Sequence, residues 1–297
     1  MDLDTLHKGR QTIVFDRHPV ILAHSAIAGK KESEGPLAGF FDHTETDTRF
    51  GQKTWEKAET RLQELALDTA RSKAQLQYSD LDVLFAGDLL NQCISSAFAI
   101  RDTRIPFLGL YGACSTMAES LTLAAAAVNA GYAARAAALT SSHFATAERQ
   151  YRFPLGYGGQ RTPTAQWTVT GSGCCIVASG GRGPYLNCAT IGRIEDYGIK
   201  DANNMGAAMA PAAYSTLRAH FADTGLRPQD YDLIVTGDLG TLGSTIVTDL
   251  FQRDGVEFGA NYRDCGVLIY DLKRQDVHAG GSGCGCGASG LCGYLLR

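Results

Sequence analysis

The feature that most constrains this fold is a short apolar run, Pro106–Leu110, followed by the small-residue turn Tyr111–Thr116 and the Ala-rich run Leu121–Ala130. This order predicts a strand, a tight turn and a helix, with Cys114 at the end of the strand and near the start of the helix. Backbone N–H groups and the helix dipole favour negative charge there, so we expect a lowered pKa for this thiol. Cys114 is therefore a candidate nucleophile, although a small buried cysteine beside Gly and Ala fits the same pattern.

A second constraint is an ungapped internal repeat. Residues 79–89 (SDLDVLFAGDL) match residues 229–239 (QDYDLIVTGDL), and the helical pattern of residues 58–76 falls on residues 208–226, both at an offset of 150 positions. Duplication of a half-domain is the economical explanation. Two βαβ-type halves place ligands at the carboxyl ends of their strands, where the halves meet. Asp88, Cys114, His143 and Asp238 all follow predicted strands.

The remaining pattern is that of an α/β protein with two halves, residues 11–180 and 185–297. The elements expected along the chain are strands within 11–25, an irregular surface loop at 29–50, an amphipathic helix at 55–73, strands at 82–86, 133–139, 167–178 and 185–197, a loop-rich insertion at 144–164 and a last apolar strand at 266–270. A helix is expected to begin after Gly283. By analogy with the first half, the final C-terminal strand of the second half is expected to be missing.

Composition excludes several functional classes. The net charge of −4 gives no indication of nucleic-acid binding, and no run of about 18 apolar residues predicts a membrane span. The N-terminus lacks the apolar core of a signal peptide. Nine cysteines, an odd number in a long chain, indicate reduced thiols. Their spacing lacks the paired C-x₂₋₄-C pattern of zinc sites, so we expect no metal and no cofactor.

Several motifs together resemble a known family. They are GQKTWE (51–56), AGDLLNQ (86–92), YGACST (111–116), TSSH (140–143), ATAERQ (145–150), MAPAA (209–213), LIVTGDL (233–239) and AGGSGC (279–284). The chain resembles the thiolase and ketoacyl-synthase superfamily, and more closely its stage V sporulation protein AD branch, from about Gln11 to Cys286. The resemblance implies a thiolase-like fold: two duplicated βαβ halves in an α/β/α/β/α layering, forming a homodimer through the strand at about 133–142.

The same resemblance implies a binding role. By this resemblance, the protein is expected to bind dipicolinic acid, a pyridine dicarboxylate, free or as its calcium chelate, for its uptake into the developing spore. It is expected to work with membrane-embedded partner proteins and not to span the membrane itself. The expected location is the periphery of the spore inner membrane or the cytoplasm.

The residues at the expected site include only some of the groups that a catalytic site of this superfamily needs. A ketoacyl synthase needs a nucleophilic Cys, a His that moves protons and a further donor that stabilises an oxyanion. Cys114 is present, but Asp238 stands where the superfamily has His, and the turn Gly280–Gly283 replaces an Asn-containing turn. His143 could replace one missing part or be a satisfied structural histidine. We therefore expect a non-catalytic binding protein; an acyltransferase that uses Cys114 and a scaffold without ligand are the alternatives.

A planar dianion needs basic side chains, hydroxyls or backbone N–H groups, and an aromatic or small-residue wall. The two carboxylates Asp88 and Asp238 would suit a ligand that carries Ca²⁺, or would serve as helix caps. Phe144, Tyr151 or Phe153 could supply the wall; the family commonly has Asn where this chain has Phe144. The candidate ligand-binding residues are Asp88, Asn91, Cys114, Ser115, Thr116, His143, Arg149, Arg152, Phe153, Asp238, Ser282 and Gly283.

Overall fold

The computed structural model describes residues 6–151 and 159–297. Its main sheet has the strand order β4–β3–β9–β7–β5–β6. The strands are β3 (Val20–Ala28), β4 (His43–Thr44), β5 (Val83–Gly87), β6 (Phe107–Leu110), β7 (Arg135–Ser142) and β9 (Gly171–Ala178). Strand β5 is parallel to both β6 and β7, so Gly87, Leu110 and Ser142 end at the same edge of the sheet. The turns that carry Asp88, Cys114 and His143 therefore leave from one edge, as the sequence predicts.

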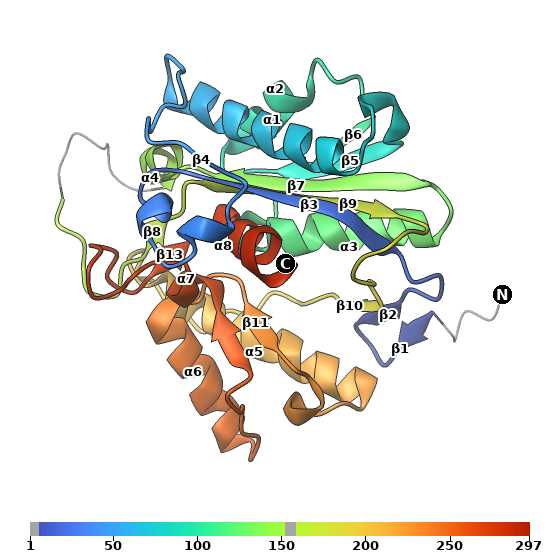
Figure 1. Ribbon diagram of the computed structural model, residues 1–297. Coiled ribbons are helices and arrows are strands. Elements are labelled where there is room, and N and C mark those ends of the chain that lie inside the picture. The colour runs from blue at the N-terminus through green and yellow to red at the C-terminus, as the bar shows by residue number, and fades with distance from the viewer. Residues whose placement is uncertain (1–5, 152–158) are drawn as a thin grey trace.

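Helices cover both faces of this sheet. Helices α1 (Trp55–Lys73) and α2 (Ile94–Ile100) lie on one face, and α3 (Thr116–Asn129) and α8 (Cys284–Gly290) lie on the other (Figure 1). Helix α1 begins where the predicted helix begins, because Thr54 accepts a hydrogen bond from the Lys57 N–H as its N-cap. Its buried Ala58, Leu62 and Ala66 pack against the sheet in a continuous hydrophobic core.

The second half repeats the beginning of the first. Helix α5 (Met205–Thr224) starts 150 positions after α1, and β11 (Ile234–Thr236) falls within the repeat of β5. Strand β11 pairs in parallel with β12 (Tyr262–Asp264), and α6 (Gly240–Arg253) packs on α5. Figure 1 shows the resulting layers: α1 and α2, the main sheet, α3 and α8, the small β11–β12 sheet, and then α5 and α6. The expected α/β/α/β/α layering is confirmed.

Short elements complete the described chain. Strands β1 (His7–Lys8), β2 (Thr12–Val14) and β10 (Cys188–Thr190) form one small sheet, and β8 (Trp167–Thr168) pairs with β13 (Gly281–Ser282). Helix α4 spans Phe144–Tyr151, α7 spans Cys265–Leu268, and a π-helical turn spans Leu291–Leu295. The helix expected after Gly283 is thus α8. The division of the chain at 180–185 stays a prediction.

Some expected elements were wrong. Residues 266–270 are not a strand, because Asp264 caps α7 by accepting the Val267 N–H, and the strand β12 ends just before it. The expected strand at 185–197 is reduced to β10. The insertion at 144–164 begins as helix α4 rather than as a loop.

The loop at 29–50 and the strand at 133–142 also differ from expectation. The loop is not wholly at the surface, because Glu32, Leu37 and Phe41 are buried. Strand β7 lies between β9 and β5 and is hydrogen-bonded to both, so it cannot offer a free edge to a second copy. The edge strand on that side of the sheet, within the described residues, is β6.

None of the helices in the described residues is long and apolar enough to cross a membrane.

Candidate functional site

Cys114 lies in a strained turn between β6 and α3. It belongs to a 3₁₀ turn, Ala113–Ser115, and Ala113 has a φ of 48°, which non-glycine residues seldom adopt. The residue as a whole is partly exposed. Its thiol is hydrogen-bonded to the carboxylate of Asp238 and accepts a hydrogen bond from the Gly283 N–H. Burial, followed by the charge of Asp238, raises the pKa of Cys114 well above its usual value. The expected lowering of this pKa was therefore wrong.

Asp238 is the second member of this centre. It follows β11, is only 5% exposed, and accepts a hydrogen bond of 2.8 Å from the Gly283 N–H. Burial raises its pKa to about 6, against the opposing hydrogen bonds from Cys114, Gly283 and Ser282. The structure thus brings together four of the predicted residues, Cys114, Asp238, Ser282 and Gly283, from both halves of the chain.

Two residues that the sequence reasoning missed hold Asp238 in place. The carboxylate of Asp264 accepts the N–H groups of Leu239 and Gly240, both at 2.9 Å. The buried amide of Gln166 donates to the carbonyl oxygens of Asp238 and Gly281 at 2.8 and 2.6 Å. These bonds fix the backbone of the turn and leave the Asp238 side chain for Cys114 and Gly283. Neither residue carries a motif that a single sequence would reveal.

Asp88 has a different task, although it occupies the matching position of the first repeat. It is fully buried and accepts bonds from the Leu90 N–H, the Ser96 N–H and the Ser96 hydroxyl, at 2.8, 2.8 and 2.6 Å. These bonds close the turn and hold the start of α2. Of its two suggested roles, the structure favours the helix cap over a calcium ligand.

A buried polar network continues from Asp88 to Glu59. The Gln63 amide donates to the hydroxyls of Ser96 and Ser141 at 2.9 and 2.8 Å, and Ser141 donates to Glu59 at 2.9 Å. Burial, and then the charge of Asp88, raises the pKa of Glu59. The sequence signal for this network was available: Glu59 and Gln63 are a polar i, i+4 pair beside the apolar stripe of α1.

Two tyrosines lie next to Cys114. Tyr111 and Tyr151 are each 51% exposed, and their hydroxyls are hydrogen-bonded to each other. The Tyr151 hydroxyl also donates to the Leu89 carbonyl at 2.6 Å. Burial and the Tyr111 hydroxyl raise the pKa of Tyr151, with smaller contributions from the thiols of Cys284 and Cys114. Of the aromatic candidates, Tyr151 therefore lies beside Cys114, together with Tyr111, which the sequence reasoning did not consider.

His143 is a satisfied structural histidine. Its Nδ1 accepts the Ala145 N–H at 3.1 Å, so its Nε2 carries the proton and donates to the Thr48 carbonyl at 2.8 Å. The side chain is 2% exposed, and burial lowers its pKa. With both ring nitrogens engaged in this way, the expectation that His143 replaces a catalytic part is not supported. Its neighbour Phe144 stacks on Trp167 with ring centroids 3.8 Å apart.

The hydroxyl candidates are bound to their own turn. Ser115 donates to the Gly112 carbonyl and Thr116 donates to the Ala113 carbonyl, both at 2.7 Å. These bonds stabilise the strained turn before α3, so neither hydroxyl proton is directed at a ligand. Asn91 is exposed in the turn before α2.

Of the arginine candidates, the structure describes Arg149, which is engaged in an ion pair. Arg149 lies on α4, and its guanidinium pairs with Glu56 on α1. It is half-exposed there, and its role as a fork for a carboxylate ligand stays a prediction. Arg152 and Phe153 lie outside the described residues.

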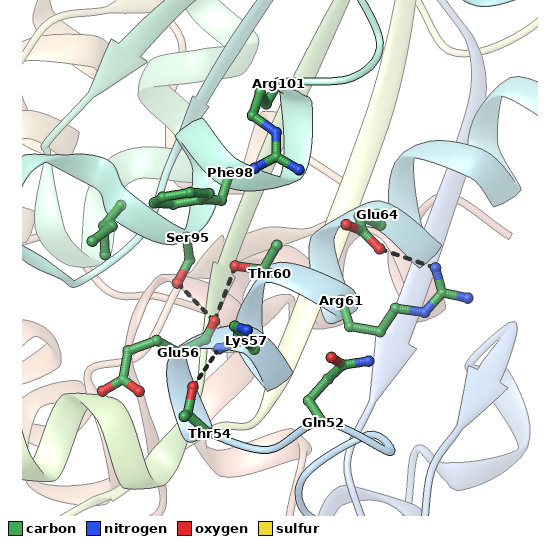
Figure 2. A pocket seen from close by; sticks show the side chains of 11 residues that line it. Gln52, Thr54, Glu56, Lys57, Thr60, Arg61, Glu64, Ser95, Phe98 and Arg101 are labelled. Carbon is green, nitrogen blue, oxygen red and sulfur yellow. Dashed lines mark hydrogen bonds and ion pairs between the residues drawn. The ribbon is translucent and has the colours of Figure 1, made fainter.

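A separate cavity lies elsewhere, between the start of α1 and α2. It has a volume of about 500 Å³, and its cations are Lys57, Arg61 and Arg101 (Figure 2). Arg61 pairs with Glu64 at 3.0 Å, and Ser95 and Thr60 donate to the Glu56 carbonyl. Figure 2 shows the Ser95 hydroxyl bonded from α2 to the Glu56 carbonyl of α1, and the Arg61–Glu64 pair within α1. Cys114 and Asp238 are not among the residues that line it.

A cation held by protein side chains alone is not supported. Within residues 6–151 and 159–297, no group of three or more His, Cys, Asp or Glu side chains is arranged to hold a metal ion. A calcium ion in this protein would therefore have to bring further oxygen ligands with it.

Comparison with solved structures shows the fold. The chain is similar to the priming β-ketosynthase of the R1128 polyketide pathway (TM-score 0.57, 16% identity, 95% of this chain and 88% of that one). It is also similar to cerulenin-bound OleA of Xanthomonas campestris (TM-score 0.62, 13% identity, 94% and 88%). A third is 3-oxoacyl-[acyl-carrier-protein] synthase III of Aquifex aeolicus VF5 (TM-score 0.53, 11% identity, 88% and 87%). The fold is thiolase-like.

Comparison of sequences shows the family. The family model described as stage V sporulation protein AD (SpoVAD) matches residues 9–297. Stage V sporulation protein AD of Bacillus subtilis (strain 168) is 48% identical over 290 residues, which cover 97% of this chain and 85% of that protein. The resemblance seen in the motifs is thereby confirmed. The chain is a thiolase-fold member of the stage V sporulation protein AD family.

Proposed function

We propose that this protein is a non-catalytic thiolase-fold protein that binds dipicolinic acid, free or as its calcium chelate, for uptake into the developing spore. The proposal that the protein is non-catalytic is supported by the contact between the Cys114 thiol and the Asp238 carboxylate. An acyl-transfer centre needs a thiolate and hydrogen-bond donors for a developing oxyanion. An ionised carboxylate opposes both, because it disfavours the thiolate and repels the oxyanion.

The surroundings of this thiol suit a flat ligand. The half-exposed rings of Tyr111 and Tyr151 offer aromatic surface beside Cys114, and their hydroxyls offer polar contacts at the ring edge. A bare dianion would be repelled by Asp238, whereas a calcium chelate would present its cation to this carboxylate. Calcium dipicolinate is therefore the form that the geometry favours.

The proposal includes a homodimer, formed through β6 rather than through β7. Strand β6 is at the edge of the main sheet in the described residues, and Leu108 on it is 55% exposed. Phe98 of the adjacent α2 is 51% exposed. An exposed edge strand with apolar side chains favours pairing with a second copy. Light scattering should give the mass of a dimer, and Leu108→Lys should give a monomer.

Membrane-embedded partner proteins belong to the same proposal, as the family resemblance implies. The protein would then act at the spore inner membrane or in the cytoplasm. Co-purification from sporulating cells, with and without detergent-solubilised membranes, would identify these partners.

The experiment that tests ligand binding is a calorimetric titration with dipicolinate, with and without Ca²⁺. We expect saturable binding that is stronger with Ca²⁺ and survives Cys114→Ala. Tyr111→Ala should weaken it at least about tenfold, because a stacking surface is lost. Arg149→Ala is the matched control and should leave it unchanged, since Arg149 is paired with Glu56.

The two alternatives give different results. An acyltransferase would form a thioester on Cys114 from acyl-coenzyme A, visible as an added mass on the intact protein. A scaffold would show no heat with either form of dipicolinate.

A further inference from the structure

A buried carboxyl group that the proposed function does not use lies between α1 and α4. Glu59 is fully buried. Its Oε1 accepts the Ser141 hydroxyl at 2.9 Å, and its Oε2 lies 2.6 Å from the hydroxyl oxygen of Thr146. Among residues 6–151 and 159–297, no Lys, Arg or His pairs with Glu59. Burial of a carboxylate without a cation is unfavourable, so this setting favours the neutral form of the group.

The Thr146 hydroxyl has one proton and two acceptors within reach. Its oxygen lies 2.6 Å from Oε2 of Glu59 and 2.9 Å from the carbonyl oxygen of His143. A hydroxyl donates one proton but can accept further bonds. If Glu59 is protonated, it donates to Thr146 and Thr146 donates to the His143 carbonyl, so both contacts are hydrogen bonds. If Glu59 is ionised, one of the two contacts lacks a proton.

The other end of the same network fixes the remaining protons. The Gln63 amide donates to the hydroxyls of Ser96 and Ser141, so both hydroxyls donate onward. Ser96 donates to Asp88, and Ser141 donates to Glu59. Asp88 also accepts two backbone N–H groups, so it acts only as an acceptor, as an ionised carboxylate does. Two carboxylates in one buried network are not both ionised, so the proton belongs to Glu59.

We propose that Glu59 is protonated in the native protein, that it donates its proton to Thr146, and that this bond positions helix α4. Helix α4 carries Tyr151, whose hydroxyl is bonded to that of Tyr111 beside Cys114. Glu59 is thus a positioning residue that acts on the candidate site through Tyr151. This consequence rests on the proposed function, whereas the protonation of Glu59 does not.

The groups around Glu59 oppose its ionisation. Burial, and then the charge of Asp88, raises the pKa of Glu59, against the hydrogen bonds from Thr146 and Ser141. The Cys284 thiol of α8 has a pKa well above its usual value and stays neutral. When Glu59 ionises, its proton leaves to solvent, and a second negative charge then faces Asp88.

Helix α4 is the element that responds to this second charge. Ser141 lies on β7 and Gln63 on α1, and the sheet and α1 are joined by a continuous hydrophobic core. Thr146 lies on α4, which has only eight residues. A further contact between α1 and α4 is the partly exposed ion pair of Glu56 and Arg149. Exposed pairs contribute little, so the buried bond of Glu59 decides how α4 sits on α1.

Infrared spectroscopy tests the protonation directly, without a ligand. At about pH 7 an ordinary carboxyl group is ionised. The difference spectrum of wild type minus Glu59→Gln should nevertheless contain the carbonyl stretch of a protonated carboxyl group. Thr146→Val should shift this stretch, because it removes the acceptor, and the matched control Thr146→Ser should leave it in place. A carboxylate band in the difference spectrum, or an unshifted stretch in Thr146→Val, would overturn the proposal.

Tryptophan emission tests the position of α4. Phe144, the first residue of α4, stacks on Trp167 with ring centroids 3.8 Å apart, so movement of α4 changes the surroundings of this indole. Raising the pH from neutral to alkaline should change the emission of wild type more than that of Glu59→Gln, whose amide donates to Thr146 at every pH. Glu56→Gln, which removes the exposed ion pair, is the matched control and should follow wild type. Equal changes in wild type and Glu59→Gln would contradict the positioning role.

Ligand binding tests the consequence for the candidate site. Over the same rise in pH, wild type should lose several-fold more affinity for calcium dipicolinate than Glu59→Gln. Equal losses would show that Glu59 does not act on this site. If wild type binds no dipicolinate at any pH, the proposed function fails, while the infrared and emission results still decide the protonation of Glu59 and its hold on α4.

Discussion

The two copies of the internal repeat place an aspartate at the same position and use it differently. In the first copy, Asp88 is enclosed, and its carboxylate holds the Leu90 N–H and the start of α2. In the second copy, Asp238 is directed toward Cys114 and the Gly283 N–H. One aspartate is structural, and the other belongs to the candidate site.

A substitute partner makes this difference possible. The N–H of Leu90 in the first copy corresponds to the N–H of Gly240 in the second. The Leu90 N–H bonds to Asp88 itself, whereas the Gly240 N–H bonds to Asp264 at 2.9 Å. Because Asp264 from β12 satisfies the turn, Asp238 is free for another role. Duplication thus gave two similar turns. In the second turn, the Asp264 carboxylate of the neighbouring strand β12 accepts the backbone N–H groups, so the Asp238 side chain can serve the candidate site.

Replacing the structural aspartate should have the largest effect. Asp88→Ala leaves two buried N–H groups and a hydroxyl without an acceptor, so we expect a loss of about 3 kcal/mol of stability. The midpoint of thermal unfolding should fall by roughly 6–10 °C. Asp80→Ala, at an exposed cap, should cost less than about 1 kcal/mol. Equal losses for the two variants would break the comparison.

The site aspartate should show its effect through pH. Its folded pKa of about 6 exceeds the ordinary value of 3.8, so the folded state binds more protons between these values. The contribution of Asp238 to the free energy of unfolding is therefore largest at low pH and is lost as the pH rises toward about 6. Asp238→Asn should gain roughly 2–3 kcal/mol relative to wild type between about pH 4 and about pH 7. Denaturant unfolding at several pH values measures this; a pH-independent difference would contradict it.

The helix caps of the two copies should instead behave alike. Thr54 caps α1 by accepting the Lys57 N–H at 3.3 Å, and Asn204, at the matching position, caps α5 by accepting the Ala207 N–H at 3.2 Å. Thr54→Ala and Asn204→Ala should each cost about 1 kcal/mol in denaturant unfolding. A difference of more than about 1 kcal/mol between them would show that the copies diverged at their caps as well.

Patterns that act locally were predictable from the sequence. The period of α1 and its cap, the apolar runs of β5 and β6, and the offset between Asp88 and Asp238 lie within short stretches. They placed Cys114 and Asp238 on neighbouring turns of two halves, and the structure brings them into contact.

Long-range contacts were not predictable in this way. Nothing beside Asp238 in the sequence reveals Asp264 or Gln166, and nothing beside Arg149 reveals its pairing with Glu56. The expected pKa of Cys114 had the wrong sign for the same reason: the helix start is visible in the sequence, but the burial and the carboxylate that oppose it are contributed by the fold.

The most direct test of the account is the pH–rate profile of Cys114 alkylation by iodoacetamide, followed by peptide mass spectrometry. Free cysteine has a midpoint near about pH 8.5. We predict a higher midpoint for Cys114 in the wild-type protein, and a midpoint in Asp238→Asn that is lower than in wild type. A wild-type midpoint below about pH 7, unchanged in Asp238→Asn, would show an activated thiol and contradict the claim that Asp238 keeps Cys114 from acting as a nucleophile.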